Sequence, residues 1–83
     1  MVRVVEVRHV AGHILWIRFD DGTSGEVDLS QEIWGVVFEP LRDVENFRKV
    51  GVHPDLHTIA WPNGADFAPE FLYDQVRSAV GQS

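Results

Sequence analysis

Apolar and polar residues alternate through the first third of the chain. The odd positions carry most of the apolar side chains, namely Val5, Val7, Leu15, Ile17, Phe19, Val27 and Leu29. Charged residues such as Glu6, Arg18 and Asp28 occupy even positions. A period of two is typical of strands with one buried face. The pattern therefore predicts a three-stranded antiparallel meander with its odd face in the core and its even face in solvent.

The same alternation constrains the loops between these strands. Because odd residues must stay opposite odd residues, each hairpin loop must contain an odd number of residues. We therefore expect three-residue loops at Ala11-Gly12-His13 and at Asp20-Asp21-Gly22, with Gly22 left-handed. The first loop would set three cross-strand pairs: Val10 with Ile14, Arg8 with Trp16, and Glu6 with Arg18.

The second half of the chain predicts two helices and two further strands. Residues 30–39 have an irregular pattern, for which we expect a short helical turn followed by extended chain. Pro40 suits the first turn of a helix, and Leu41, Val44 and Phe47 follow at three-residue spacing on one stripe. Residues 49–53 and 57–61 predict strands. A last helix is expected from Pro69.

This order of elements predicts an α+β fold. Its antiparallel sheet would contain the three-stranded meander, a helix, two strands and a C-terminal helix, with the helices on one face. We expect a single domain over residues 1–80 and a disordered tail over residues 81–83. The predicted core comprises Leu15, Ile17, Phe19, Val27, Leu29, Leu41, Phe47, Trp61 and Leu72.

The most specific segment is a strand, turn and helix start that contains Trp61, Pro62, Asn63, Gly64, Asp66 and Pro69. Pro62 favours an extended Trp61, and an Asn-Gly pair readily adopts positive φ, so the strand should end here. Asp66 has two interpretations. Its carboxylate could accept hydrogen bonds from the turn and the helix start, or it could act as an acid or base in an aromatic cleft beside Trp61. We favour the structural interpretation.

Charge and composition narrow the class of partner. The chain has 83 residues and a net charge of -6, which disfavours direct contact with nucleic acid. It has no cysteine, and no apolar run approaches the length of a membrane span. The start lacks the pattern of a signal peptide. We therefore expect a cytoplasmic protein that contacts neither nucleic acid nor membrane.

The sequence gives little evidence for catalytic or metal-binding residues. His9 and His13, like His53 and His57, are four residues apart, a spacing that binds zinc when both lie on one helix. Neither pair is expected to be helical, so we predict no metal site and no cofactor. No serine lies in a nucleophile motif, and the glycines miss the phosphate-binding spacings. We predict no catalytic residue.

The even face of the meander is the candidate interface. It would expose apolar residues among charges, and the residues proposed to make contact are Val4, Arg8, Val10, Ile14, Trp16 and Arg18. Such a composition favours a protein partner or self-association. Alternatively, Arg8 merely covers the ring of Trp16.

The chain resembles a family of small bacterial proteins known as domain of unknown function twenty-four forty-two. The resemblance rests on the Trp61-Pro62-Asn63-Gly64-Ala65-Asp66 signature and on the blocks Phe19-Asp20-Asp21-Gly22, Val36-Val37-Phe38-Glu39-Pro40-Leu41-Arg42-Asp43 and Phe47-Arg48-Lys49-Val50. Relatives often have a second proline where this chain has Val36. Some members carry an added helix-turn-helix domain, for which we expect this chain to be too short. The family has no established catalytic residues.

Many members are encoded beside another small protein in what resembles a toxin-antitoxin pair. The resemblance thus implies a non-enzymatic protein-binding module, the antitoxin-like or regulatory half of a two-protein system. The alternative is a small ligand-binding domain or enzyme that uses a cleft around Trp61 and Asp66, with Asn63 and Tyr73.

Overall fold

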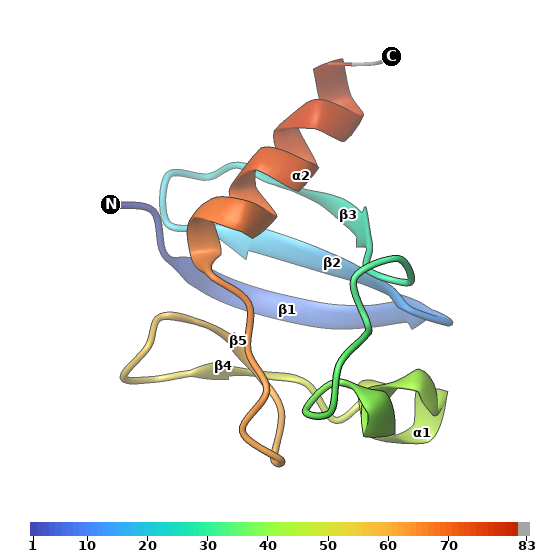
Figure 1. Ribbon diagram of the computed structural model, residues 1–83. Coiled ribbons are helices and arrows are strands. Elements are labelled where there is room, and N and C mark those ends of the chain that lie inside the picture. The colour runs from blue at the N-terminus through green and yellow to red at the C-terminus, as the bar shows by residue number, and fades with distance from the viewer. Residues whose placement is uncertain (82–83) are drawn as a thin grey trace.

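The computed structural model describes the backbone of residues 1–81 and the side chains of residues 1–78. Its elements in chain order are β1 (Val4–Ala11), β2 (Ile14–Phe19), β3 (Ser24–Asp28), the 3-10 helix η1 (Glu39–Arg42), α1 (Val44–Phe47), β4 (Gly51–His53), β5 (Thr58–Ala60) and α2 (Pro69–Gly81). Strands β1, β2 and β3 form one antiparallel sheet in that order, and β4 pairs with β5 in a second (Figure 1). The fold is α+β, as predicted.

Helix α2 packs on the odd face of the meander. Leu15, Ile17 and Phe19 are fully buried there, and the Phe19 ring lies edge to face against Tyr73 of the helix with ring centroids 5.0 Å apart. A Cβ atom at Gly25 of β3 would lie 2.9 Å from Cγ1 of Val76. The helix can approach β3 this closely because position 25 has no side chain.

The hairpin between β2 and β3 has the predicted geometry. Leu15 pairs with Val27, so odd residues face odd residues. The N–H of Phe19 donates to the Thr23 carbonyl at 2.8 Å, which closes a three-residue loop, and Gly22 has φ 90°. The loop length predicted from the pairing of odd residues with odd residues is therefore correct for this hairpin.

The hairpin between β1 and β2 is only partly as predicted. Glu6 pairs with Arg18 and Arg8 with Trp16, as expected, but Ala11 pairs with Ile14 in place of Val10. The register shifts between His9 and Ala11, so the turn is two residues long. The predicted pairing of Val10 with Ile14 is wrong because an extra residue of β1 is accommodated at this shift.

A second irregularity reverses the faces at the start of β1. Val4 pairs with Phe19 and the next pair is Glu6 with Arg18, which leaves Val5 as the extra residue. Val4 is 2% exposed and Val5 is 44% exposed, so the prediction for both side chains is wrong. A one-residue shift exchanges the faces of a strand because side chains alternate along it.

The segment before α1 differs from its prediction. Residues 30–38 form turns and bends with neither a helix nor a strand. The helix expected from Pro40 is divided into η1 and α1, because Asp43 is extended at φ -76° and ψ 118°. Its carboxylate accepts the N–H of Glu45 at 3.0 Å and caps α1. Leu41 and Phe47 are nevertheless buried as predicted.

The strands β4 and β5 belong to their own sheet, whereas the sequence predicted a single sheet. A backbone hydrogen bond links the two sheets, in which the Val4 N–H donates to the His57 carbonyl at 2.9 Å. His57 has φ 56°, an uncommon conformation for a residue with a side chain.

All nine predicted core residues are buried in one cluster, which also includes Val4, Ile33, Ile59, Ala65 and Val76. Helix α2 extends to Gly81, the first residue of the predicted tail, and the other two residues of that tail, 82–83, lie outside the described part of the chain. Over residues 1–81, no helix combines the length and the apolar character that crossing a membrane requires.

Replacing Phe19 with alanine should destabilise the domain by ~3 to 5 kcal/mol, because it removes a fully buried ring from the centre of the core. Val10→Ala on the same sheet is the control, since Val10 is exposed and should change stability by less than about 0.5 kcal/mol. Thermal melts of both variants check this. Equal melting temperatures for Phe19→Ala and the parent would contradict the inward orientation of the odd face.

Candidate functional site

The signature turn repeats the geometry of the loop between β2 and β3. The Gly64 N–H donates to the Trp61 carbonyl at 3.0 Å, and the Trp61 N–H donates to the Ala65 carbonyl at 2.9 Å. Gly22 and Phe19 make the equivalent bonds in the earlier loop, and both Gly22 and Gly64 have φ 90°. Each loop thus has three residues with a left-handed glycine in the last position.

The residue before each glycine binds its own loop and also a distant segment. In the first loop, Asp21 accepts the Thr23 N–H at 2.9 Å with one carboxylate oxygen and the Tyr73 hydroxyl at 2.6 Å with the other. The hydrogen bond from Tyr73 is the main cause that lowers the pKa of Asp21, followed by that from Thr23. The first loop is thereby tied to α2.

Asn63 plays the same double role in the signature turn. Its side-chain oxygen accepts the Ala65 N–H at 3.1 Å, and its amide nitrogen donates to the Val37 carbonyl at 2.8 Å. An amide can accept and donate at once, whereas an ionised carboxylate can only accept. Asn63 is therefore suited to hold a carbonyl of another segment.

Asp66 does not have the predicted acceptor role. The residue is exposed, its backbone forms an isolated bridge with Ala60, and its carboxylate makes no hydrogen bond to any other described residue. Asn63 makes the hydrogen bond in the turn that was assigned to Asp66. Helix α2 begins at Pro69, as predicted.

Trp61 is the buried centre of the signature, with 4% of its surface exposed. Its indole N–H donates to the Phe47 carbonyl at 2.7 Å. Its ring lies 5.5 Å from the ring of Phe47 and 5.9 Å from that of Phe67, measured between centroids. The turn is thus fixed to α1 by one hydrogen bond and by aromatic packing.

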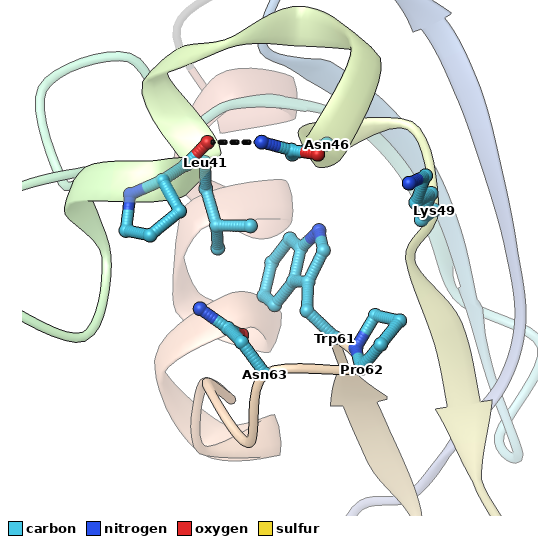
Figure 2. Close-up of a pocket in the computed structure, with 7 residues that line it drawn as sticks. Leu41, Asn46, Lys49, Trp61, Pro62 and Asn63 are labelled. Atoms are coloured by element: carbon cyan, nitrogen blue, oxygen red, sulfur yellow. Dashed lines mark hydrogen bonds between the residues drawn. The ribbon is translucent and has the colours of Figure 1, made fainter.

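A cleft of about 180 Å³ lies between the signature turn and the segment that contains η1 and α1 (Figure 2). Its lining residues are Pro40, Leu41, Asn46, Lys49, Trp61, Pro62 and Asn63. The Asn46 amide donates to the Pro40 carbonyl at 3.0 Å, the contact drawn in Figure 2. Most of the wall is apolar, with one ammonium group and two amides. Asp66 is not part of this lining.

An exposed apolar segment escaped prediction. We call residues 34–37 the apolar loop, in which Trp34 is 68% exposed, Val36 92% and Val37 46%. Buried Ile33 precedes it, and the Ile33 carbonyl accepts from Arg42 Nε at 3.2 Å. The bond from Asn63 holds its other end. The only cue in the sequence was a group of apolar residues that fits neither strand nor helix periodicity.

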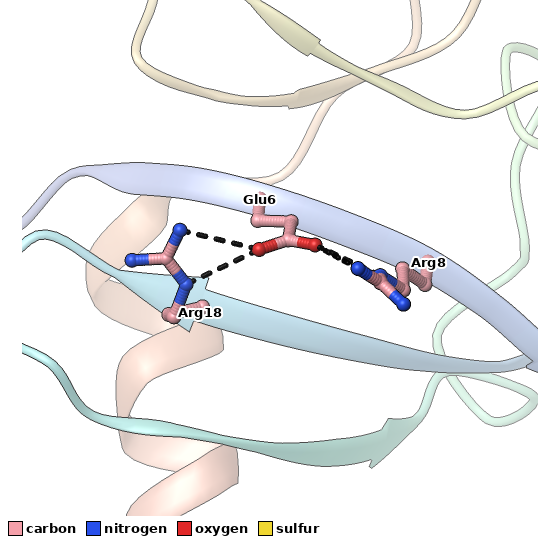
Figure 3. Close-up of polar contacts among 3 residues, drawn as sticks. All are labelled: Glu6, Arg8 and Arg18. Carbon is pink, nitrogen blue, oxygen red and sulfur yellow. Dashed lines mark hydrogen bonds and ion pairs between the residues drawn. The ribbon is translucent and has the colours of Figure 1, made fainter.

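The even face of the meander is smaller than predicted, because Val4 points into the core. The guanidinium carbon of Arg8 lies 5.7 Å from the centre of the Trp16 ring. Glu6 bridges two arginines, with Arg8 at 2.8 Å and Arg18 at 3.2 Å (Figure 3). These hydrogen bonds, first that from Arg8, lower the pKa of Glu6. Val10 is exposed and Ile14 half-buried.

The histidine pairs take part in local contacts. His13 Nε2 lies 2.9 Å from the Leu41 carbonyl and its ring packs 4.7 Å from that of Phe47. His9 Nε2 lies 2.9 Å from the Gly12 carbonyl, and His53 Nδ1 accepts the Asp55 N–H at 3.1 Å. In the part of the chain that the structure describes, no three metal-ligating side chains gather at one place.

Comparison with models of known protein families assigns the chain to a family. Residues 4–78 match the family described as "Protein of unknown function (DUF2442)". The chain belongs to this family. No curated protein and no solved structure matched it. Membership in DUF2442 confirms the resemblance given by the sequence and assigns no activity, so the function has to be inferred from the site.

In this DUF2442 domain, Asn63→Ala should destabilise the fold by ~1 to 2 kcal/mol, because it leaves the half-buried Ala65 N–H without its acceptor. Asp66→Asn is the matched variant and should change the free energy of unfolding by less than about 0.5 kcal/mol, since its carboxylate is exposed. Urea denaturation of both measures the difference. A larger loss for Asp66→Asn than for Asn63→Ala would restore the original assignment.

The even face of the DUF2442 domain remains a predicted interface. If Trp16 is an interface anchor, Trp16→Ala should weaken assembly by at least ~2 kcal/mol and leave the odd-face core intact. Sedimentation velocity at increasing concentration compares parent and variant. A parent that stays monomeric, and a partner that binds equally well without Trp16, would show that the ring only supports Arg8.

Proposed function

We propose that this chain is a non-enzymatic protein-binding module that contacts its partner through the apolar loop. The partner would be the second member of a bacterial two-protein system, in which this chain is the antitoxin-like or regulatory half. The two-protein setting rests on the family resemblance. The binding role rests on the surface of the domain.

The exposure of Trp34 carries the proposal. Trp34 is 68% exposed and Val36, two residues further on, is 92% exposed, so one short loop presents two apolar side chains to water. Interface centres are enriched in tryptophan, and a few such residues supply most of the binding energy. The apolar loop has the composition of such a centre.

The way in which the loop is held supports the same role. Asn63 binds the Val37 carbonyl at one end, and Arg42 binds the Ile33 carbonyl at the other. The Phe38 N–H also donates to the Gly35 carbonyl at 3.2 Å, which folds the loop back on itself. A segment fixed before binding loses less conformational entropy when it docks. The signature thus preorganises the loop.

Charge favours a protein with a basic rim over nucleic acid or membrane. The chain carries a net charge of -6, and exposed Glu39 follows the apolar loop. Nucleic acid and anionic lipid would both be repelled by this excess of acid. A basic protein surface would instead be attracted and oriented by it.

The alternative is a ligand-binding domain or enzyme with a cleft around Trp61 and Asp66. A cleft lies at Trp61, but Asp66, the residue that would supply acid or base chemistry, is not part of its lining. The cleft also offers no other carboxylate or histidine. These features weigh against catalysis at this place.

Trp34→Ala should weaken binding of the partner at least about tenfold, because it truncates the most exposed aromatic anchor. The tagged chain is first used to isolate its partner from the native cell, and the purified pair is then titrated by calorimetry. Leu56→Ala is the matched control, since Leu56 is also a large exposed apolar residue but lies outside the loop. It should bind like the parent.

Thermal melts of both variants should match the parent, because neither residue belongs to the core. The proposal is wrong if the partner binds Trp34→Ala as tightly as the parent, or if no protein is retained by the parent chain.

A further inference from the structure

The cleft beside the apolar loop is sized for one residue. Its volume of about 180 Å³ is below the ~300 to 1,000 Å³ of sites that enclose drug-sized ligands. Asn63 connects the two features, since it lines the cleft and also holds the Val37 carbonyl of the loop. A chain docked on the loop could therefore place a side chain in the cleft.

The walls indicate what kind of side chain fits. Trp61 and Leu41 line the cleft with little exposed surface, 4% and 3% of each residue, and the Trp61 indole N–H is already donated to the Phe47 carbonyl. Most of the accessible apolar surface comes from the exposed residues Pro40 and Pro62. An aliphatic side chain would gain from burial against these groups, whereas a polar one would lose hydrogen bonds to water.

The rim carries donors and a positive charge. Lys49 lines the cleft and forms no ion pair with any residue in the described part of the chain. The Asn46 and Asn63 amides each donate one of their two amide hydrogens, to Pro40 and to Val37 respectively. No acidic residue belongs to the lining, although the chain as a whole has a net charge of -6. The rim therefore suits a carboxylate.

We infer that the cleft binds the C-terminal residue of the partner, with its aliphatic side chain against the apolar wall that includes Pro40 and Pro62 and its carboxylate beside Lys49. A chain terminus combines both groups in one residue, which matches a cleft with room for one. This inference rests on the proposed function, because it assumes that a protein partner docks on the adjacent loop.

Short peptides test the cleft without the partner. The probes are N-acetyl-glycyl-leucine with a free carboxylate and the same peptide as its C-terminal amide, titrated into the ¹⁵N-labelled chain. The free acid should shift the Trp61 indole N–H and the Lys49 amide signals saturably. The amide should bind about threefold to fivefold more weakly, as expected for loss of one exposed ion pair.

Lys49→Gln should reduce the affinity for the free acid to that for the amide. Arg48→Gln is the matched control, since Arg48 is the neighbouring cation, lies outside the lining and pairs with Glu45 at 3.5 Å. It should leave both affinities unchanged. Three results would each overturn the inference. The acid and the amide could bind equally tightly, the cleft signals could show no saturable shift, or Lys49→Gln could bind the free acid as tightly as the parent.

The same probes separate this inference from the proposed function. Trp34→Ala should keep the peptide affinity and lose the partner, because Trp34 does not line the cleft. If the parent chain does not bind the peptides but the partner still needs Trp34 to bind, only the role of the cleft is overturned. If the parent chain binds the peptides but the partner binds Trp34→Ala as tightly as the parent, the role of the loop is overturned.

Discussion

The buried hydrogen bond from the Trp61 indole to the Phe47 carbonyl joins the signature turn to the helical segment that precedes it in the chain. At 2.7 Å and fully enclosed, it fixes the end of β5 to the end of α1. Phe47 in turn packs against His13 at the tip of the first hairpin. A buried donor that loses its acceptor costs ~1 to 3 kcal/mol, so the position of this carbonyl is closely constrained. Both walls of the cleft, and through Asn63 the apolar loop, depend on it.

Much of the fold could be predicted because paired strands must keep their inward side chains at alternate positions, and this alternation is visible in the sequence. From Leu15 to Leu29 every inward residue was assigned correctly, since a shift of one residue would expose the whole face. The failures are local. Extra residues at Val5 and Val10 move the register without any marker in composition. The division of the helix at Asp43 follows from a cap that competes with helix continuation.

The candidate site was less predictable because it depends on contacts across long stretches of sequence. Asn63 and Asp66 are both polar residues near a helix start, and only the folded turn shows which of them reaches the Ala65 N–H. The apolar loop has no periodicity, so its exposure could not be inferred. Knowing that Asn63 reaches Val37, 26 residues away, requires the tertiary structure.

The difference between Asp21 and Asn63 gives the two loops different responses to acid. The folded state lowers the pKa of Asp21, so its stabilising contribution is complete above the ordinary value of 3.8 and is lost as the pH falls through the lowered value. Asn63 has no proton to gain in this range. Acid would therefore weaken the hydrogen bond from Tyr73 of α2 to Asp21, while the link from Asn63 to the apolar loop persists. Within one small domain, the same turn thus occurs twice. The contact that Asp21 makes depends on pH, whereas the contact that Asn63 makes does not.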